Sequence, residues 1–288
     1  MSEEIAVMKG DVVTGAWRPA LRGTRDLWQA ARRLFCRPGV WLGCSIVALV
    51  AGASFPVRAA GYPGFGLNAS RVVVMGDARG GTLVTALNNS TNVYLVQSRV
   101  LPADGLSGYP QYQAKSKVPF LVTPPLSRME ANSQLPLRIL NMPGNGLPQD
   151  RESLFFLLSR AIPSVTPRDS KAGGGPQVVM ALEQYVKLFY RPAGLSPTAI
   201  FDDAVAPALR FARVNGRLQV TNPTPYHITF GLLTVNGKSV DAAALRRMVP
   251  PMGQQDYPLP AGVTGGPVAW QIIDEFGLMP AKRTRALP

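Results

Sequence analysis

From residue 70 onward, short apolar runs alternate with turn-forming segments, and this pattern restricts the fold more than any other feature of the chain. The runs are rich in Val, Leu, Ile, Phe and Tyr, and no window before Pro192 has the long apolar stripe of an amphipathic helix. About seven short strands within about 120 residues are typical of an immunoglobulin-like sandwich. The predicted strands are Arg71–Met75, Thr82–Leu87, Val93–Val100, Val118–Val122, Leu135–Leu140, Leu154–Leu158 and Val178–Tyr190.

A second, smaller β-domain is predicted after the linker Arg191–Pro197, which is rich in Pro and Gly. The dipeptide Asn236-Gly237 between apolar runs indicates a two-residue hairpin, and Ala242–Met248 is expected to form a single helical turn or a loop. The apolar runs of this part are Leu218–Thr221, His227–Val235 and Val268–Ile273. The 28 Gly and 27 Pro residues of the chain also suit many strands joined by turns. We therefore expect an all-β chain with domains at residues 60–193 and 194–288.

Residues 1–59 differ in composition from the rest and have the order of a secretory signal. A long basic region precedes the uncharged run Pro38–Val57, and Val57-Arg-Ala59 places small residues at a cleavage site before Ala60. Ala51-Gly-Ala53 is a second candidate site. The alternative is a membrane anchor, but the densest apolar core, Val40–Ala53, is shorter than the roughly 20 residues that a spanning helix needs. We expect a cleavable signal peptide with a long basic n-region at residues 1–59.

The exported part of the chain offers little chemistry for catalysis. Both cysteines, Cys36 and Cys44, lie in the predicted signal peptide, which leaves no thiolate nucleophile and no Cys-ligated metal. The single histidine, His227, lies in an apolar run and has no candidate triad partner, so a structural role is expected. Gly173–Gly175 is followed by Pro-Gln and does not form a P-loop. We expect no enzyme, no catalytic residue, no metal and no cofactor.

The formal net charge of the chain is +13, which on its own is compatible with nucleic acid, anionic lipid or an acidic protein partner. The excess of Lys and Arg is spread along the chain, and no basic run has interleaved aromatic residues. Because export also argues against nucleic acid, we expect none as a partner.

Five segments resemble motifs of the periplasmic pilus chaperones of the P-pilus type, the PapD-like family, and they occur in the same order along the chain as in that family. The most specific is Leu147–Phe156, with Ile162-Pro163 behind it at the spacing of the family. The others are Thr123–Glu130, Lys187–Pro192, Asn222–Tyr226 and Ile273-Asp274 before Phe276-Gly277. Together they lie between residues 123 and 277. The resemblance implies two immunoglobulin-like domains set as an L, a periplasmic location, and delivery of pilus or fimbrial subunits to an outer-membrane usher.

The resemblance also implies how subunits are held, by donor-strand complementation. Pilus subunits of this class lack their last strand, and the chaperone inserts its own last strand of domain one into the gap. Val178, Met180 and Leu182 lie at alternate positions and would present three apolar groups on one strand face. Without the resemblance, an ordinary core face is the simpler interpretation of this alternation. An exposed apolar strand edge would also favour self-association of the free protein.

Two further sets of charged residues follow from the resemblance. Arg71 and Lys187 match the cations that grip the carboxylate of the subunit's C-terminus, whereas each alone would be interpreted as a solvated strand charge. Strict alternation puts Lys187 on the face opposite Leu182, so a bulge or twist is expected between them. Glu152, Arg191 and Asp274 match an ion network between the two domains.

The chain departs from the family at three points. Leu158-Ser159 stands where a small polar residue followed by an aliphatic one is usual, and the frequent disulfide of domain two is absent. The loop between Pro163 and Val178 is somewhat longer than in the short-loop chaperones, yet it lacks the paired cysteines of the long-loop class, so we assign the chain to the short-loop group. The main alternative function is an exported, membrane-anchored immunoglobulin-like adhesin or binding module, and an enzyme is a distant third.

Overall fold

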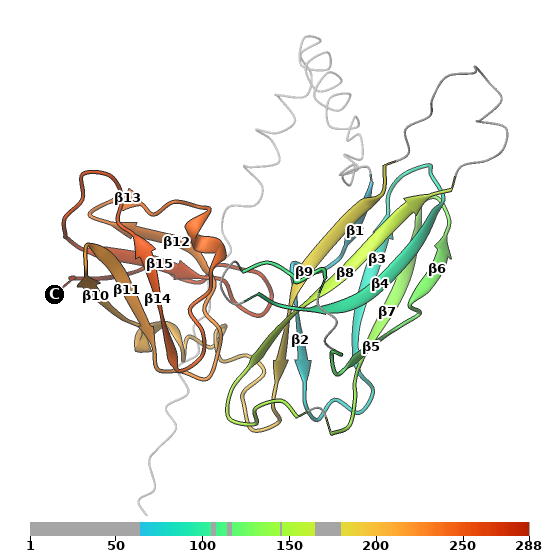
Figure 1. Cartoon of the computed structure of the whole chain (residues 1–288), viewed down its shortest axis with the longest axis horizontal. Coiled ribbons are helices and arrows are strands. Elements are labelled where there is room, and N and C mark those ends of the chain that lie inside the picture. The colour runs from blue at the N-terminus through green and yellow to red at the C-terminus, as the bar shows by residue number, and fades with distance from the viewer. Residues whose placement is uncertain (1–63, 105–107, 114–116, 145, 165–179, 288) are drawn as a thin grey trace, which may run out of the picture. The chain divides into compact units, whose positions relative to one another are not determined.

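The structure is a computed structural model that describes residues 64–104, 108–113, 117–144, 146–164 and 180–287. The predicted signal peptide at 1–59 and the predicted donor residue Val178 lie outside the described residues. Strands β1 to β9 and strands β10 to β16 form two separate groups, each with its own sheets (Figure 1).

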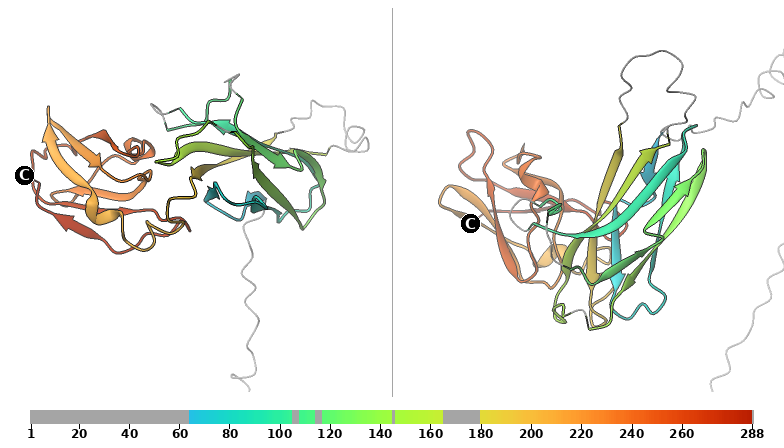
Figure 2. Two further views of the ribbon diagram at one scale, coloured as in Figure 1. Left: turned by 90° about the horizontal axis from the view of Figure 1, so that it is seen from below. Right: turned by 45° about the vertical axis from the view of Figure 1, so that its right-hand side comes forward.

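The first group is a two-layer sandwich (Figure 2). One layer has the strand order β1-β3-β7-β5, and the other has the order β2-β9-β8-β4-β6. The strands are β1 (Phe65–Leu67), β2 (Arg71–Met75), β3 (Thr82–Asn88), β4 (Tyr94–Pro102), β5 (Phe120–Thr123), β6 (Leu126–Met129), β7 (Ser133–Asn141), β8 (Ser153–Pro163) and β9 (Leu182–Arg191). All seven predicted strands of this part are present; β2 has the predicted bounds, and the other six have shifted ends.

Alternation of side chains builds the core between these two layers. In β4, Tyr94 and Val96 are buried, whereas Leu95 and Gln97 are exposed. This alternation is expected when only one face of a strand is covered. Val84, Leu137 and Leu188 from other strands meet the buried residues of β4 in one apolar cluster. A buried hydroxyl pair, Ser98 Oγ and Ser159 Oγ at 2.9 Å, satisfies the polar groups that β4 and β8 carry inward.

The second group is also a two-layer arrangement, with sheets in the orders β10-β11-β14 and β13-β12-β15-β16. Its core is separate from the first and contains Trp270, Tyr257 and Phe230. Its elements are η1 (Ala206–Ala208), β10 (Arg210–Val214), β11 (Arg217–Asn222), β12 (Phe230–Val235), β13 (Lys238–Ser239), η2 (Ala244–Arg246), β14 (Gly253–Pro258), β15 (Val268–Ile272) and β16 (Arg283–Arg285).

Two local predictions for the second group are confirmed. Asn236 and Gly237 have φ values of 48° and 75° and connect β12 to β13, with Val235 paired to Lys238. Positive φ at both central residues is the requirement of the tight hairpin turn that Asn-Gly favours. The stretch Ala242–Met248 contains one short helical turn, η2. The sequence did not predict β10, β14 or β16, nor β1 and β6 in the first group.

Candidate functional site

Strand β9 has one edge that is only partly covered. Over Leu182–Tyr190 it pairs with β8 on one side. On the other side β2 runs parallel to β9 but covers only Lys187–Arg191. Among the described strands, none pairs with the second edge from Leu182 to Val186, where the backbone groups remain available to another chain.

The predicted donor residues that the structure describes lie at this open end of β9. Met180 is 74% exposed and Leu182 is 42% exposed, so neither belongs to the core of the sandwich. Further along the strand, Val186 and Leu188 are buried in that core. On this face of the strand, Gln184 separates the buried Val186 from the exposed Leu182 and Met180, and its Oε1 accepts a hydrogen bond of 2.7 Å from the backbone N–H of Leu67.

The bulge expected between Leu182 and Lys187 is wrong. Strand β9 pairs with β8 in continuous register from Leu182 to Tyr190, and the faces alternate strictly. Leu182 shares a face with Val186, while Lys187 shares the opposite face with Tyr185. No bulge is needed, because a strand added along the edge meets side chains of both faces.

Arg71 and Lys187, which are 116 positions apart in the chain, are direct partners in the parallel pairing of β2 with β9. Arg71 Nη1 donates a hydrogen bond of 2.8 Å to the carbonyl oxygen of Ile273. Its guanidinium carbon lies 5.7 Å from the ring centre of Phe189, and its Nε is buried without a hydrogen-bond partner. For Lys187, the described residues provide neither an ion pair nor a hydrogen bond. Among the described residues, neither of these two neighbouring cations has a carboxylate within ion-pair distance.

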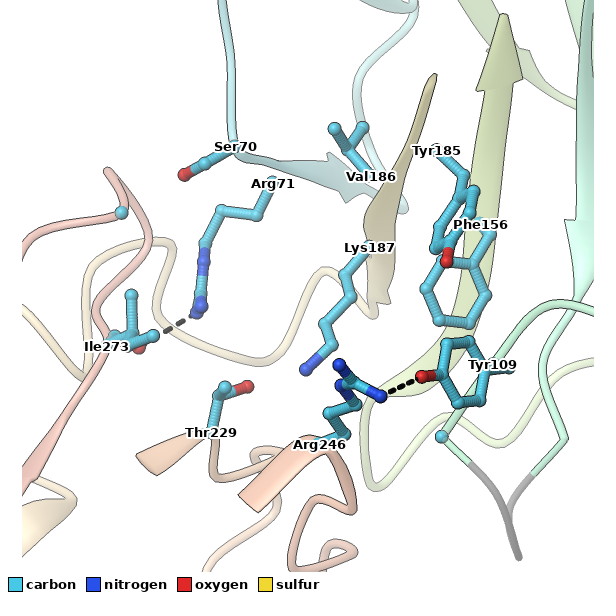
Figure 3. A pocket seen from close by; sticks show the side chains of 12 residues that line it. Ser70, Arg71, Tyr109, Phe156, Tyr185, Val186, Lys187, Thr229, Arg246 and Ile273 are labelled. Carbon is cyan, nitrogen blue, oxygen red and sulfur yellow. Dashed lines mark hydrogen bonds between the residues drawn. The ribbon is translucent and has the colours of Figure 1, made fainter. Parts of the chain in front are cut away.

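Burial makes both charges costly. It lowers the pKa of Arg71 to about 10, against the opposing effect of Asp274, Glu275 and Glu152. Burial, and then the charge of Arg71, lower the pKa of Lys187 to about 8. Both side chains line a pocket of about 390 Å³, together with Tyr185 and other residues (Figure 3). An anion in this pocket would relieve a repulsion that the free protein carries.

The predicted ion network is present with one correction. Arg191 is almost fully buried and donates hydrogen bonds of 2.9 Å and 2.6 Å to Glu152 Oε1. Its second carboxylate partner is Glu275, 3.0 Å from Nη1, and not Asp274. Asp274 is buried, but its Oδ1 accepts the backbone N–H groups of Phe276 and Leu278. Its short side chain is occupied by its own turn, so the longer neighbouring side chain reaches Arg191.

The network also contains His227, for which the sequence predicts a structural role. Its backbone N–H donates to Glu152 Oε2 at 2.7 Å, and its Nδ1 lies 3.3 Å from the same oxygen. Burial alone would raise the pKa of Glu152, but hydrogen bonding with His227 and the charge of Arg191 outweigh it and hold the pKa below its usual value. Glu275 also accepts the backbone N–H groups of Ile200 and Phe201. The network therefore joins β8, β9 and the second sandwich.

The described residues contain no group of three or more His, Cys, Asp or Glu side chains that could hold a metal ion. Within the same ranges, no helix is long and apolar enough to cross a membrane.

Comparison with known proteins identifies the family. Residues 64–196 match the family described as "Pili and flagellar-assembly chaperone, PapD N-terminal domain", and residues 204–284 match "Pili assembly chaperone PapD, C-terminal domain". The chain belongs to the PapD family of pili assembly chaperones. Because this family consists of assembly chaperones and not of enzymes, the expectation of a non-catalytic protein is confirmed.

Individual relatives agree with this assignment. The chaperone is 33% identical to chaperone protein FocC of Escherichia coli over 76% of this chain and 88% of the relative. It is also 33% identical to FimC of Escherichia coli strain K12, over 84% and 92% of the two chains. Among solved structures, the SafB chaperone in complex with the SafA pilin of Salmonella enterica is similar, with 29% identity, a TM-score of 0.65 and coverage of 79% and 98%. Fimbrial chaperones of this family are periplasmic.

Proposed function

We propose that this chaperone captures pilus or fimbrial subunits by adding the free edge of β9 to the incomplete sheet of the subunit. The observation that carries the proposal is the open edge from Leu182 to Val186, which runs directly into the pocket that holds Arg71 and Lys187. An extended segment added to an exposed edge gains main-chain hydrogen bonds, and pockets for alternate side chains add specificity. The similar SafB chaperone has been solved with its pilin bound, which supports a subunit as the partner.

In this proposal the apolar donors are Val178, Met180 and Leu182. The exposed side chains of Met180 and Leu182 would enter the groove that the missing strand leaves in the subunit, and Val178 would follow by alternation. Each apolar side chain of this size contributes about 1.5–3 kcal/mol when it is fully buried, less the cost of ordering the strand. Family membership favours this function over the membrane-anchored adhesin. The same edge would let the free protein self-associate.

The anchor of the bound subunit is its C-terminal carboxylate, held by Arg71 and Lys187. A carboxylate between two cations forms charge-assisted hydrogen bonds, which are short and strong in a partly buried site. It also fixes the register of the added strand, because a shift by one residue would leave both the carboxylate and the cations unpaired.

The anchor is tested by replacing each cation in turn. Arg71→Ala and Lys187→Ala are expected to abolish capture of the cognate subunit, measured as co-purification from periplasm, while circular dichroism of the free protein stays unchanged. Lys282→Ala removes an exposed lysine outside the pocket and is expected to capture normally. Wild-type yields of subunit with either pocket variant would contradict the anchor.

The donor strand is tested separately. The double variant Met180→Ser, Leu182→Ser is expected to weaken subunit capture by more than tenfold, since two apolar groups are lost from the complex. Little change is expected in the unfolding midpoint, because both side chains are exposed in the free protein. Leu83→Ser alters an apolar residue of β3 in the other sheet whose exposure lies between those of Met180 and Leu182, and it serves as the matched control. Equal loss of capture in this control would argue against a donor role for β9.

We further propose that residues 1–59 direct export to the periplasm and are cleaved after Ala59, that residues 60–193 and 194–288 form the two chaperone domains, and that loaded subunits pass to an outer-membrane usher. The family matches at 64–196 and 204–284 support these boundaries. Determination of the N-terminus of the exported protein tests the cleavage site, with Ala60 as the expected first residue.

A further inference from the structure

The pocket that holds Arg71 and Lys187 is lined by a third cation, Arg246. Arg246 ends the short helical turn η2 and comes from the second sandwich, whereas the other two cations come from the first. Figure 3 shows the head groups of Arg246 and Lys187 close to one another, whereas Arg71 lies to one side and points toward Ile273. Among the described residues, no carboxylate lines this pocket and none forms an ion pair with Arg246.

A tyrosine holds Arg246 at the pocket. Arg246 Nη1 donates a hydrogen bond to Tyr109 Oη, and the guanidinium carbon lies 5.5 Å from the centre of the tyrosine ring. Tyr109 belongs to the connection between β4 and β5, and its neighbour Gly108 packs directly on η2. Gly108 has a φ of 73°, and a Cβ there would lie 2.6 Å from the carbonyl oxygen of Arg246. Only glycine suits this backbone conformation and this close contact.

The three cations do not share the same electrostatic surroundings. Arg71 lies in the field of Asp274, Glu275 and Glu152, which offsets part of its charge. Lys187 has no acidic neighbour of comparable influence. A single carboxylate bound between Arg71 and Lys187 would therefore leave the charge of Arg246 unmatched on the same pocket wall. Complementarity of charge across an interface calls for a second anionic group.

We propose that Arg246 is a specificity-determining residue that binds an acidic side chain, Asp or Glu, next to the C-terminal carboxylate of the captured subunit. The inference rests on the proposed function, since it takes the carboxylate anchor as given. Arg246 and Tyr109 select among subunit tails by charge, while Arg71 and Lys187 accept any free C-terminus. Tyr109 is a positioning residue, because it acts through the guanidinium that it holds.

The test uses the purified protein and short synthetic peptides of alternating Val and Thr, which end in Glu-Val or Gln-Val with either a free carboxylate or an amide. The dissociation constants are measured by isothermal titration calorimetry at low salt. The wild type is expected to bind the Glu peptide about three- to fivefold more tightly than the Gln peptide, as for an exposed charge pair at the upper end of its range. Arg246→Gln is expected to remove this preference and to leave the affinity for the Gln peptide unchanged.

Arg247→Gln is the matched control, because Arg247 is the next residue, is also exposed, and does not line this pocket. It is expected to keep the wild-type preference. The proposal would be overturned if Arg246→Gln kept the preference for the Glu peptide. It would also be overturned if the wild type showed no preference or bound neither peptide. Amidation tests the anchor independently. A preference for Glu that persists when amidation has no effect would contradict the Arg71–Lys187 anchor while it supports the role of Arg246.

Discussion

Replacement of Lys187 by Met is expected to make the free chaperone more stable and, at the same time, unable to capture subunits. The ammonium group of Lys187 is largely desolvated, faces Arg71, and has no carboxylate among the described residues to compensate it. One pKa unit corresponds to about 1.4 kcal/mol, so the shift to about 8, reduced for the remaining solvent exposure, predicts a gain of about 1–3 kcal/mol. Methionine retains most of the apolar stem, which limits any loss of packing.

The lowered pKa of Lys187 also determines how the stability difference between the variant and the wild type changes with pH. The pKa of Lys187 falls from 10.5 to about 8 on folding, so between these values the unfolded chain binds more protons than the folded one. Stability of the wild type should therefore rise with pH across this window. The Lys187→Met variant lacks this contribution. Its advantage over the wild type should be largest below pH 8 and should vanish toward pH 10.5.

Urea unfolding of both proteins at pH 7 and pH 10 measures the effect on stability, and subunit capture is measured at matched pH. Capture by the wild type should weaken as the pH rises above 8, since Lys187 then loses the charge that binds a carboxylate. Lys282→Met replaces an exposed lysine and is expected to change neither the stability nor the capture of subunits. A variant less stable than the wild type at pH 7 would show that Lys187 supports the fold and is not a strained binding group.

The sequence predicted strands where burial on one face produces an apolar run, and it missed strands that lack this signal. Arg71–Met75 was predicted with the same bounds as β2, and most other predicted strands differ from the structure by a few residues at their ends. By contrast β14, Gly253–Pro258, has the polar run Gln254-Gln255-Asp256 at its centre, and only Tyr257 is buried. Its strand conformation comes from pairing with β11, a tertiary effect that no local pattern carries.

The charged residues of the site were found through the resemblance to a family and not through spacing. Arg71 and Lys187 become neighbours only when β2 and β9 pair in parallel, and neither residue alone differs from a surface charge. Arg246 and Tyr109 were missed for the same reason, since η2 and the β4–β5 connection meet only in the folded chain.

The sequence alone does not show which of two adjacent acidic residues pairs with Arg191. Two acidic residues, Asp274 and Glu275, stand side by side in one turn, and the turn decides which of them reaches Arg191. Asp274 is short enough to accept the backbone N–H groups of its own turn, a common role for aspartate. Glu275 is long enough to reach Arg191 and the N–H groups of Ile200 and Phe201. The sequence motif thus predicted where the ion network lies, but the backbone conformation of the turn determines that Glu275, and not Asp274, pairs with Arg191.

Replacement of Arg191 by Met is expected to destabilise the chaperone by about 3–5 kcal/mol, because removal of one partner leaves an uncompensated buried charge. Arg191 is the common partner of Glu152 and Glu275, whose side chains are 1% and 4% exposed. It also donates to the carbonyl oxygen of Ser196 at 2.8 Å and lies 4.7 Å from the ring centre of Tyr226. Urea unfolding at pH 7 measures the loss. Arg160→Met breaks an exposed pair with Glu183 and should cost less than about 1 kcal/mol.

A second substitution, made in the Arg191→Met variant, shows which carboxylate loses its ion-pair partner when Arg191 is removed. Glu275→Gln should restore part of the lost stability, since it removes an unpaired buried charge, whereas Asp274→Asn should restore none, because Asp274 is not in contact with Arg191. The pH dependence should also change. In the wild type the lowered pKa of Glu152 contributes stability that is lost as the pH falls below about 4.5, whereas removal of Arg191 takes away one of the effects that offset burial and so raises the pKa of Glu152. The deficit of Arg191→Met should therefore shrink in acid, and a deficit independent of pH would mean that Arg191 acts through packing and not through its charge.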